Sequence, residues 1–296
     1  MAGAGLSSWR IKSNNSIVCN PNLPSCYRVE LVSPPLSGTA GLQQIYKIAK
    51  AVKPLNPSVN KSCGLHVHVK PAQGSWALQQ LKTLSYNWCQ LESAMDLLLP
   101  NSRRYSNNNY CKSNIAVLRQ NGAAAGQHRK KFEALKDITR AVSIAGLTDL
   151  VCPTDRYYKL NLRALERHGT VEFRAAGGTS NAAKVVGYVL LFLNLADASC
   201  RGSTAPPSKH KEYVFENIVK FLAKHTGCMV LLHWLPRRKL ELNNRRRSSS
   251  SRAGGGSSSA GAGPVNVTGG GRNMRAHATS GSCGCAECRQ RTGSQR

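Results

Sequence analysis

The sequence predicts an α+β domain followed by a basic tail. Short segments in which apolar and polar residues alternate, such as RVELVS at residues 28–33, are typical of β-strands. Between them lie longer segments whose apolar residues repeat at helical spacing, most clearly over residues 76–99. After residue 236 this patterning stops, and the last 60 residues contain 11 Gly, 10 Ser and 12 Lys or Arg. We therefore expect a folded domain over residues 1–236 and a flexible, disordered tail over residues 237–296.

Six segments of the folded part predict strands. They are residues 9–11 and 16–18 around an Asn-Asn turn, residues 28–33 before Pro34 and Pro35, and residues 65–69, 157–162 and 170–175. Residues 65–69 read LHVHV, so His66 and His68 share one face of their strand.

Five segments predict helices. Apolar residues recur every three or four positions over residues 41–51, 76–99, 129–145, 182–199 and 211–224. Thr179, Ser180 and Asn181 offer side-chain oxygens that can cap the fourth of these helices. We expect the amphipathic helices to pack their apolar faces against the sheet.

Basic residues are in excess in the folded part as well as in the tail. The chain has 41 Lys and Arg against 14 Asp and Glu, a formal net charge of +27. Residues 1–236 carry +17 of this charge. Such an excess indicates either steering of an anionic substrate or binding of nucleic acid or an acidic partner.

The sequence lacks the signals of a secreted or membrane protein. The longest apolar stretch, residues 185–196, is interrupted by Gly187 and is shorter than the ~20 residues of a membrane span. The first ten residues show no charged region followed by an apolar one, as a signal peptide would. We expect a cytoplasmic protein without membrane contact, in which the 11 cysteines are reduced thiols.

Two acids and two histidines on the predicted strands are the candidates for chemistry. Glu30 lies within RVELVS, and Glu172 lies within TVEFRA, where Arg174 shares its face. A carboxylate on a strand needs a partner or a metal, and carboxylates with imidazoles such as His66 and His68 can bind a divalent cation. The structural alternatives are an ion pair between Glu172 and Arg174 and histidines that bind no ligand.

Several segments, taken together and in order, resemble the amidoligase family. They are WRIKSNNSIV, RVELVSPPL, CGLHVHV, LESAMDLLLPNSRRYSNNNYC, RYYKLNL and HGTVEFRAAGGTSNAAKVVGYV, between residues 9 and 200. The resemblance implies a glutamine-synthetase-like fold with an antiparallel, cupped sheet. It also implies that the protein joins a carboxylate to an amine with ATP and Mg²⁺, through an acyl-phosphate intermediate.

The resemblance implies roles for the residues on these strands. Glu30, His66 and Glu172 resemble Mg²⁺ ligands, with Glu30 and Glu172 on adjacent strands. Glu172, Arg174 and His66 are the candidate catalytic residues, and Arg174 would neutralise the transferred phosphoryl group.

The resemblance also implies contacts to the nucleotide. The candidates are Arg103, Arg104, Arg174 and His68. Asn161 and Thr179 match family positions that line the site. The structural alternatives are an exposed basic turn at Arg103 and Arg104, a polar strand residue at Asn161 and a helix cap at Thr179.

Two features depart from the family pattern. Members normally begin with a GxExE strand that supplies acids to the metal site, whereas this sequence begins at about the following segment. Asn14 stands where the family often has Asp. Because fewer carboxylates weaken a Mg²⁺ site, the alternative is a catalytically inactive fold that binds nucleic acid or an acidic partner. A metal hydrolase built on HVH is less favoured, since no HExxH or HxHxDH motif accompanies it.

The tail holds two further candidates. Cys283, Cys285 and Cys288, with His277, are compatible with a Zn²⁺ site, and the alternative is a redox-sensitive chain end without structure. The run of three arginines at residues 245–247 could bind nucleic acid or an acidic partner. The expected substrates are an amine and a carboxylate, carried by an amino acid, a peptide or a protein.

Overall fold

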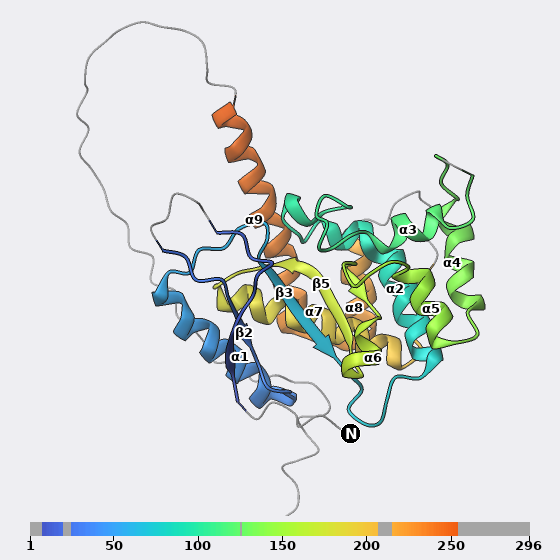
Figure 1. Cartoon of the computed structure of the whole chain (residues 1–296), viewed down its shortest axis with the longest axis horizontal. Helices are drawn as coiled ribbons and strands as arrows, with labels where there is room; N and C mark the ends of the chain where they lie inside the picture. Colours follow the sequence, from blue (N-terminus) through green and yellow to red (C-terminus); the bar gives the residue numbers. More distant parts are fainter. Residues whose placement is uncertain (1–7, 20–24, 125, 207–214, 254–296) are drawn as a thin grey trace, which may run out of the picture.

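The structure is a computed structural model that describes residues 8–19, 25–124, 126–206 and 215–253. Helices surround two small antiparallel sheets, which confirms the α+β prediction (Figure 1). The predicted zinc site of Cys283, Cys285, Cys288 and His277 lies outside the described residues.

The larger sheet has three strands in the order β3 (Gly64–Val69), β5 (Val171–Gly177) and β4 (Leu160–Asn161). Both pairs are antiparallel, and the register places Glu172 opposite His68 on one side and Asn161 on the other. β4 is shorter than the predicted strand over residues 157–162, since Tyr158 makes only an isolated bridge to Lys112. Residues from three strands thus meet at the centre of the sheet.

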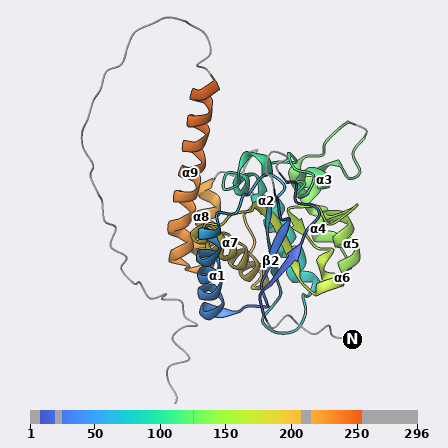
Figure 2. The ribbon, with the colours of Figure 1, turned by 60° about the vertical axis from the view of Figure 1, so that its left-hand side comes forward.

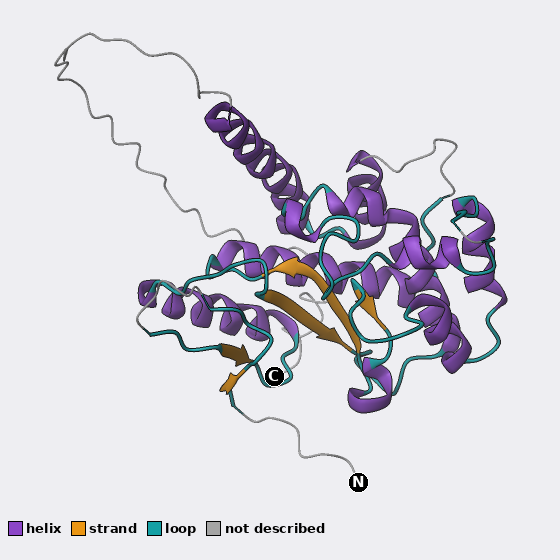
Figure 3. Ribbon diagram, turned by 45° about the horizontal axis from the view of Figure 1, so that its top comes forward, coloured by secondary structure: helices purple, strands orange, loops and turns teal. Residues whose placement is uncertain are grey.

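The smaller sheet is a pair of strands, β1 (Arg10–Ser13) and β2 (Val29–Val32), with Glu30 opposite Lys12. The predicted strand over residues 16–18 is wrong, because Asn14 Oδ1 accepts hydrogen bonds from the backbone N–H and hydroxyl of Ser16 and forms a turn. The two sheets are separate, and Figure 3 shows β1 and β2 beside α1 (Gly38–Val52). The expectation that Glu30 and Glu172 lie on adjacent strands is therefore wrong.

The core lies between the larger sheet and two long helices, α2 (Leu78–Asp96) and α7 (Ala182–Cys200). Phe173 of β5 stacks on Phe192 of α7 with ring centroids 4.6 Å apart, and Trp88 of α2 lies 5.5 Å from Phe173. This face of β5 is closed by aromatic packing. The neighbouring positions 172 and 174 consequently point to the opposite face.

By length and composition alone, α7 is apolar enough to cross a membrane. Its 19 residues extend beyond the apolar stretch noted in the sequence. In the structure α7 contacts α1, α2, α8, α9 and β3, and 56% of its most apolar window is buried. These contacts are those of the central helix of a protein core.

The predicted helix over residues 129–145 is two helices, α4 (Lys131–Arg140) and α5 (Ile144–Val151). Val142 fits the apolar period but lies in the break and is 91% exposed. Ser143 Oγ accepts a hydrogen bond from the N–H of Gly146 and starts the second helix as its N-cap. Four short elements were not predicted: α3 (Asn114–Gln120), α6 (Ala164–His168) and the 3₁₀ turns Lys53–Leu55 and Asn101–Arg103.

Two helices, α8 (Phe215–Thr226) and α9 (Met229–Ala253), follow the core. The prediction of a tail without structure from residue 237 is wrong for residues 237–253, which belong to α9. Arg238 is buried and donates hydrogen bonds to the Tyr188 hydroxyl and to the carbonyl oxygen of Leu98. These polar contacts hold α9 against α7 where the sequence has no apolar repeat, and Figure 2 shows the end of α9 extending beyond the rest of the domain.

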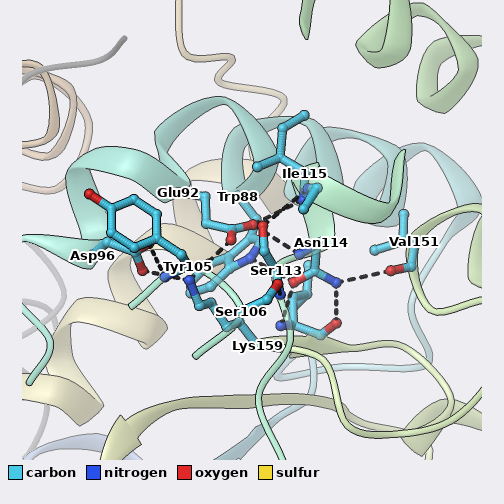
Figure 4. Close-up of polar contacts among 12 residues, drawn as sticks. Trp88, Glu92, Asp96, Tyr105, Ser106, Ser113, Asn114, Ile115, Val151 and Lys159 are labelled. Atoms are coloured by element: carbon cyan, nitrogen blue, oxygen red, sulfur yellow. Dashed lines mark hydrogen bonds and ion pairs between the residues drawn. The ribbon is translucent and has the colours of Figure 1, made fainter. Parts of the chain in front are cut away.

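A buried ion network joins the sheet to α2 and α3 (Figure 4). Lys159 is fully buried, and its Nζ lies 3.1 Å from Glu92 and 2.6 Å from Asp96. Glu92 also accepts a hydrogen bond from the N–H of Asn114 at the start of α3, and Asp96 accepts one from Tyr105. Burial alone would lower the pKa of Lys159, but the two carboxylates raise it, so the lysine stays charged.

Cys19 and Cys26 form a disulfide in the connection between β1 and β2. The expectation of reduced thiols is wrong for this pair, because the connection brings their Cα atoms to 6.0 Å. The other cysteines of the described part of the chain are free: Cys63, Cys89, Cys111, Cys152, Cys200 and Cys228.

Candidate functional site

Five polar side chains meet on the face of the larger sheet that points away from Phe173. We call them the sheet-face cluster: His66 and His68 of β3, Asn161 of β4, and Glu172 and Arg174 of β5. Strand alternation explains the arrangement, since each residue lies one position from a side chain of the core. All five are candidates from the sequence, and the structure brings them together.

Glu172 is the centre of the cluster. Its Oε1 lies 2.7 Å from Arg174 Nη1, 3.3 Å from His66 Nδ1 and 3.6 Å from His68 Nε2, and its Oε2 accepts a hydrogen bond of 2.7 Å from Asn161 Nδ2. Burial would raise the pKa of this carboxyl group, but His68, Arg174 and His66 together lower it to about 2. Glu172 is therefore a permanent negative charge among nitrogen groups.

The two histidines differ in their surroundings. Burial, followed by the positive charge of Arg174, lowers the pKa of His66 to about 4, although Glu172 acts in the opposite direction. His66 is therefore neutral at neutral pH, and its Nδ1 is the ring nitrogen that lies toward Glu172, at 3.3 Å. His68 contacts Thr170 Oγ1 at 2.9 Å through Nδ1, and its side chain is 40% exposed. The histidines thus form the open side of the cluster.

Arg174 is held from several directions. Its Nε donates to the carbonyl oxygen of Tyr110, and its guanidinium group lies 5.5 Å from the ring centroid of Tyr157. The Tyr110 and Tyr157 rings meet edge to face at 5.4 Å. Only 8% of the Arg174 side chain is exposed. The ion pair with Glu172, foreseen as the structural alternative, is present.

Arg103 and Arg104 are buried, so the alternative of an exposed basic turn is wrong. Arg103 donates to the carbonyl oxygens of Arg174 and Cys63, and Arg104 donates to that of Leu99. Arg103 thereby places a second positive charge beside the cluster, where it also lowers the pKa of His66. A direct contact of either arginine with a nucleotide stays a prediction.

Glu30 and Thr179 have local partners of their own. Glu30 accepts a hydrogen bond from Asn14 Nδ2 at 3.3 Å within the smaller sheet. Thr179 Oγ1 accepts one from the N–H of Asn181, and the Asn181 side chain caps α7. These contacts agree with a helix-start role for Thr179.

The cluster is a poor match to the donor set that Mg²⁺ requires. Mg²⁺ prefers oxygen ligands, carboxylates above all, whereas imidazole suits zinc and other transition metals. Glu172 is the only carboxylate in the cluster, and Asn161 turns its amide nitrogen toward it while its oxygen accepts from the N–H of Arg163. Within the described ranges, no group of three His, Cys, Asp or Glu side chains is arranged to hold a metal ion.

Three residues of this region were missed from the sequence. Thr170 belongs to the TVEFR segment and could have been found as the strand residue on the face of Glu172. Tyr110 supports Arg174 from a loop, and Tyr157 does so from the start of the predicted strand over residues 157–162, which is a loop in the structure. Only the tertiary structure brings them to the cluster.

Of the comparisons with known proteins, one gives a match. No curated protein and no solved structure matches the chain. The sequence profile of a family described as "Putative amidoligase enzyme" matches residues 2–196, which include the whole sheet-face cluster. This match indicates an enzyme of ligase type that forms amide bonds. Because it covers well over half of the chain, the protein belongs to this amidoligase family.

Proposed function

We propose that the protein is an ATP-dependent carboxylate–amine ligase of the cytoplasm, with a glutamine-synthetase-like arrangement of its sheet. One observation supports this above the others. The family match includes a buried pair, Glu172 and Arg174, beside a neutral histidine, His66, on one sheet face. A site of this kind can hold an oxyanion and a neutral amine next to each other.

The proposed reaction has two steps. A carboxylate oxygen takes the γ-phosphoryl group of ATP, which gives an acyl phosphate and ADP. The amine nitrogen then attacks the carbonyl carbon, so that a C–N bond forms, the C–O bond to phosphate breaks, and inorganic phosphate leaves with the electron pair. The amine loses a proton in this step.

The residues of the cluster have distinct roles in this proposal. Arg174 neutralises negative charge on the transferred phosphoryl group, and Glu172 holds both Arg174 and His66 in place. His66 donates its Nδ1 proton toward Glu172, which leaves Nε2 to accept a hydrogen bond from the amine. Any Mg²⁺ that takes part is expected to arrive with the nucleotide, since the cluster offers a single carboxylate.

Trapping of the acyl phosphate tests the function. The protein is incubated with Mg-ATP, amino-acid and peptide mixtures and hydroxylamine, and ADP and hydroxamate are measured. We expect ATP-dependent hydroxamate, reduced on the order of 100-fold in Arg174→Gln, because one lost charge contact to a transition state has that effect. The control is Arg156→Gln, whose exposed side chain lies next to Tyr157. Equal product from Arg174→Gln and the control would contradict the proposal.

A second function rests on α9. The side chain of Arg245, in the second half of α9, is 69% exposed and pairs with Glu241. The end of α9 extends away from the rest of the domain (Figure 2). Binding of nucleic acid or an acidic partner through this segment is compatible with ligase activity.

A further inference from the structure

We infer that the sheet-face cluster binds one oxyanion directly, with Glu172 as its internal counter-ion and not as a metal ligand. The inference deepens the proposed function, on which it rests for the source of the oxyanion. It concerns binding only and involves no chemical step.

The first argument is that both oxygens of Glu172 already have nitrogen partners, and that one of these partners is a cation. Arg174 Nη1 lies 2.7 Å from Oε1, and Asn161 Nδ2 lies 2.7 Å from Oε2. His66 and His68 approach Oε1 as well. A divalent cation on this carboxylate would lie next to the Arg174 guanidinium group and would have to displace it. The arginine contact is short and 94% of the Glu172 side chain is buried, so that displacement would be costly.

The second argument is the sign of the local charge. Arg174 and Glu172 form an ion pair whose charges balance, and Arg103, which donates to the Arg174 carbonyl oxygen, adds one positive charge beside them. The acid expected as a further metal ligand, Glu30, lies in the other sheet and contacts Asn14. A site with net positive charge and low exposure attracts an anion and repels a free cation.

The third argument is the unused hydrogen-bonding capacity of Arg174. A guanidinium group has five N–H donors, and in Arg174 the described residues accept from Nε and Nη1 only. Tyr157 and Tyr110 fix the plane of this group. A planar donor fork of this kind recognises the oxygens of a carboxylate or a phosphate. His66 and His68, with side chains 25% and 40% exposed, mark the side from which the ligand enters.

Direct binding measurements on the whole chain test the inference. Inorganic phosphate is titrated by calorimetry in the presence of EDTA, and Mn²⁺ binding without nucleotide is followed by electron paramagnetic resonance. We expect phosphate to bind without metal and Mn²⁺ to show no stoichiometric site. Stoichiometric Mn²⁺ binding that Glu172→Gln removes, or phosphate binding that needs Mn²⁺, would overturn the inference.

Substitutions distinguish the two possible roles of Glu172, a counter-ion of the bound anion and a metal ligand. Removing a negative charge next to the site should raise the affinity for phosphate about tenfold in Glu172→Gln, whereas Arg174→Gln should abolish binding. The matched control is Glu166→Gln, an exposed acid on α6, which should leave affinity unchanged. If circular dichroism shows that Glu172→Gln does not fold, the phosphate and Mn²⁺ binding of the unmodified protein still tests the inference. Weaker phosphate binding in folded Glu172→Gln would contradict a counter-ion role.

Competition identifies the source of the oxyanion. ADP and glutamate, a phosphate compound and a carboxylate, are each tested against bound phosphate. Competition by ADP assigns the site to the nucleotide, and competition by glutamate assigns it to the acceptor substrate. Because none of these measurements needs turnover, a protein without ligase activity that binds phosphate would refute the proposed function and leave this inference intact.

Discussion

At the scale of single residues, Gly64 decides where the His66 ring lies. A Cβ atom at position 64 would come 2.7 Å from His66 Nε2 and 3.1 Å from Arg103 Nη2, so only glycine allows the ring to lean back along the strand. We expect Gly64→Ala to move the ring away from Glu172. Ligase activity should fall at least tenfold, because displacing a group of an active site by about 1 Å can reduce the reaction rate by that much or more.

The measurement for Gly64→Ala combines activity with NMR of the His66 ring. The thermal midpoint should change little, since the closest neighbour, which must move most, is the His66 side chain at the open side of the cluster. An unchanged His66 spectrum together with full activity would show that the close approach has no role.

His66 also makes stability depend on pH. Its pKa is about 4 in the folded protein, because burial and Arg174 disfavour the charged form, and about 6.5 when the chain is unfolded. Between these values the unfolded state binds more protons, so the free energy of unfolding falls as pH drops from 6.5 to 4. The pKa of Glu172, about 2, adds a loss only below about pH 4.5.

Urea unfolding at pH 7.5, 6.0 and 5.0 measures this dependence. We expect the midpoint to fall slightly between pH 7.5 and 6.0 and more between pH 6.0 and 5.0, and His66→Gln to flatten the dependence. His233→Gln, at an exposed position of α9, is the control and should keep the slope of the unmodified protein. The same slope in His66→Gln and the unmodified protein would assign the pH effect to other groups.

The candidate site shows what could and could not be predicted for single residues. Glu172 and Arg174 were found because charged side chains in an otherwise apolar strand such as TVEFRA are costly to bury unless they have a partner or a ligand. Lys159 was missed, although it is buried completely, because a lysine in a polar segment looks exposed until Glu92 and Asp96 are seen beside it. Long-range partners of this kind have no signal in local sequence.

At the scale of elements, prediction succeeded where one period dominates. β2, β3, β5, α1, α2 and α7 all form close to their expected bounds, since their apolar positions follow a single spacing. The break between α4 and α5 was missed because Val142 continues the helical period, although Ser143 starts a new helix as its N-cap. α9 was not predicted, and beyond residue 236 Arg238 and Glu241 hold it through polar contacts that leave no apolar repeat in the sequence.

The contact between α7 and α9 gives a prediction at this scale. Gly187 lies under the Trp234 ring, and a Cβ atom there would overlap it. By helix propensity, Gly187→Ala should stabilise α7 by about 1 kcal/mol. We expect the opposite, a destabilisation of about 1–3 kcal/mol, because the ring must leave its place against Tyr188.

A double-mutant cycle with Trp234→Ala checks this reason. Denaturant unfolding should show that Gly187→Ala costs little once the ring is removed. If alanine at 187 destabilises equally with and without Trp234, the overlap is not the cause.

At the scale of the whole molecule, the structure changes where the charge of the C-terminal region belongs. Seven of the 12 Lys and Arg after residue 236 lie in residues 237–253, which form the second part of α9. Arg238 of this group is buried against Tyr188 and supports the fold. A chain that ends at residue 236 would therefore lose stability as well as charge. A truncation that removes the tail and keeps α9 should therefore end the chain at residue 253.

Nucleic-acid binding is predicted to depend on α9 more than on the residues after it. Fluorescence anisotropy with a labelled RNA, from 50 to 300 mM salt, is compared for the full chain, the chain ending at 253, and Arg245→Ala/Arg246→Ala/Arg247→Ala. If all three arginines contact phosphates, the triple substitution should reduce the slope of log affinity against log salt by about 2–3. Truncation at 253 should change the slope less, because it removes five basic residues dispersed among 43. A slope lost on truncation and kept in the triple variant would place the binding surface after α9.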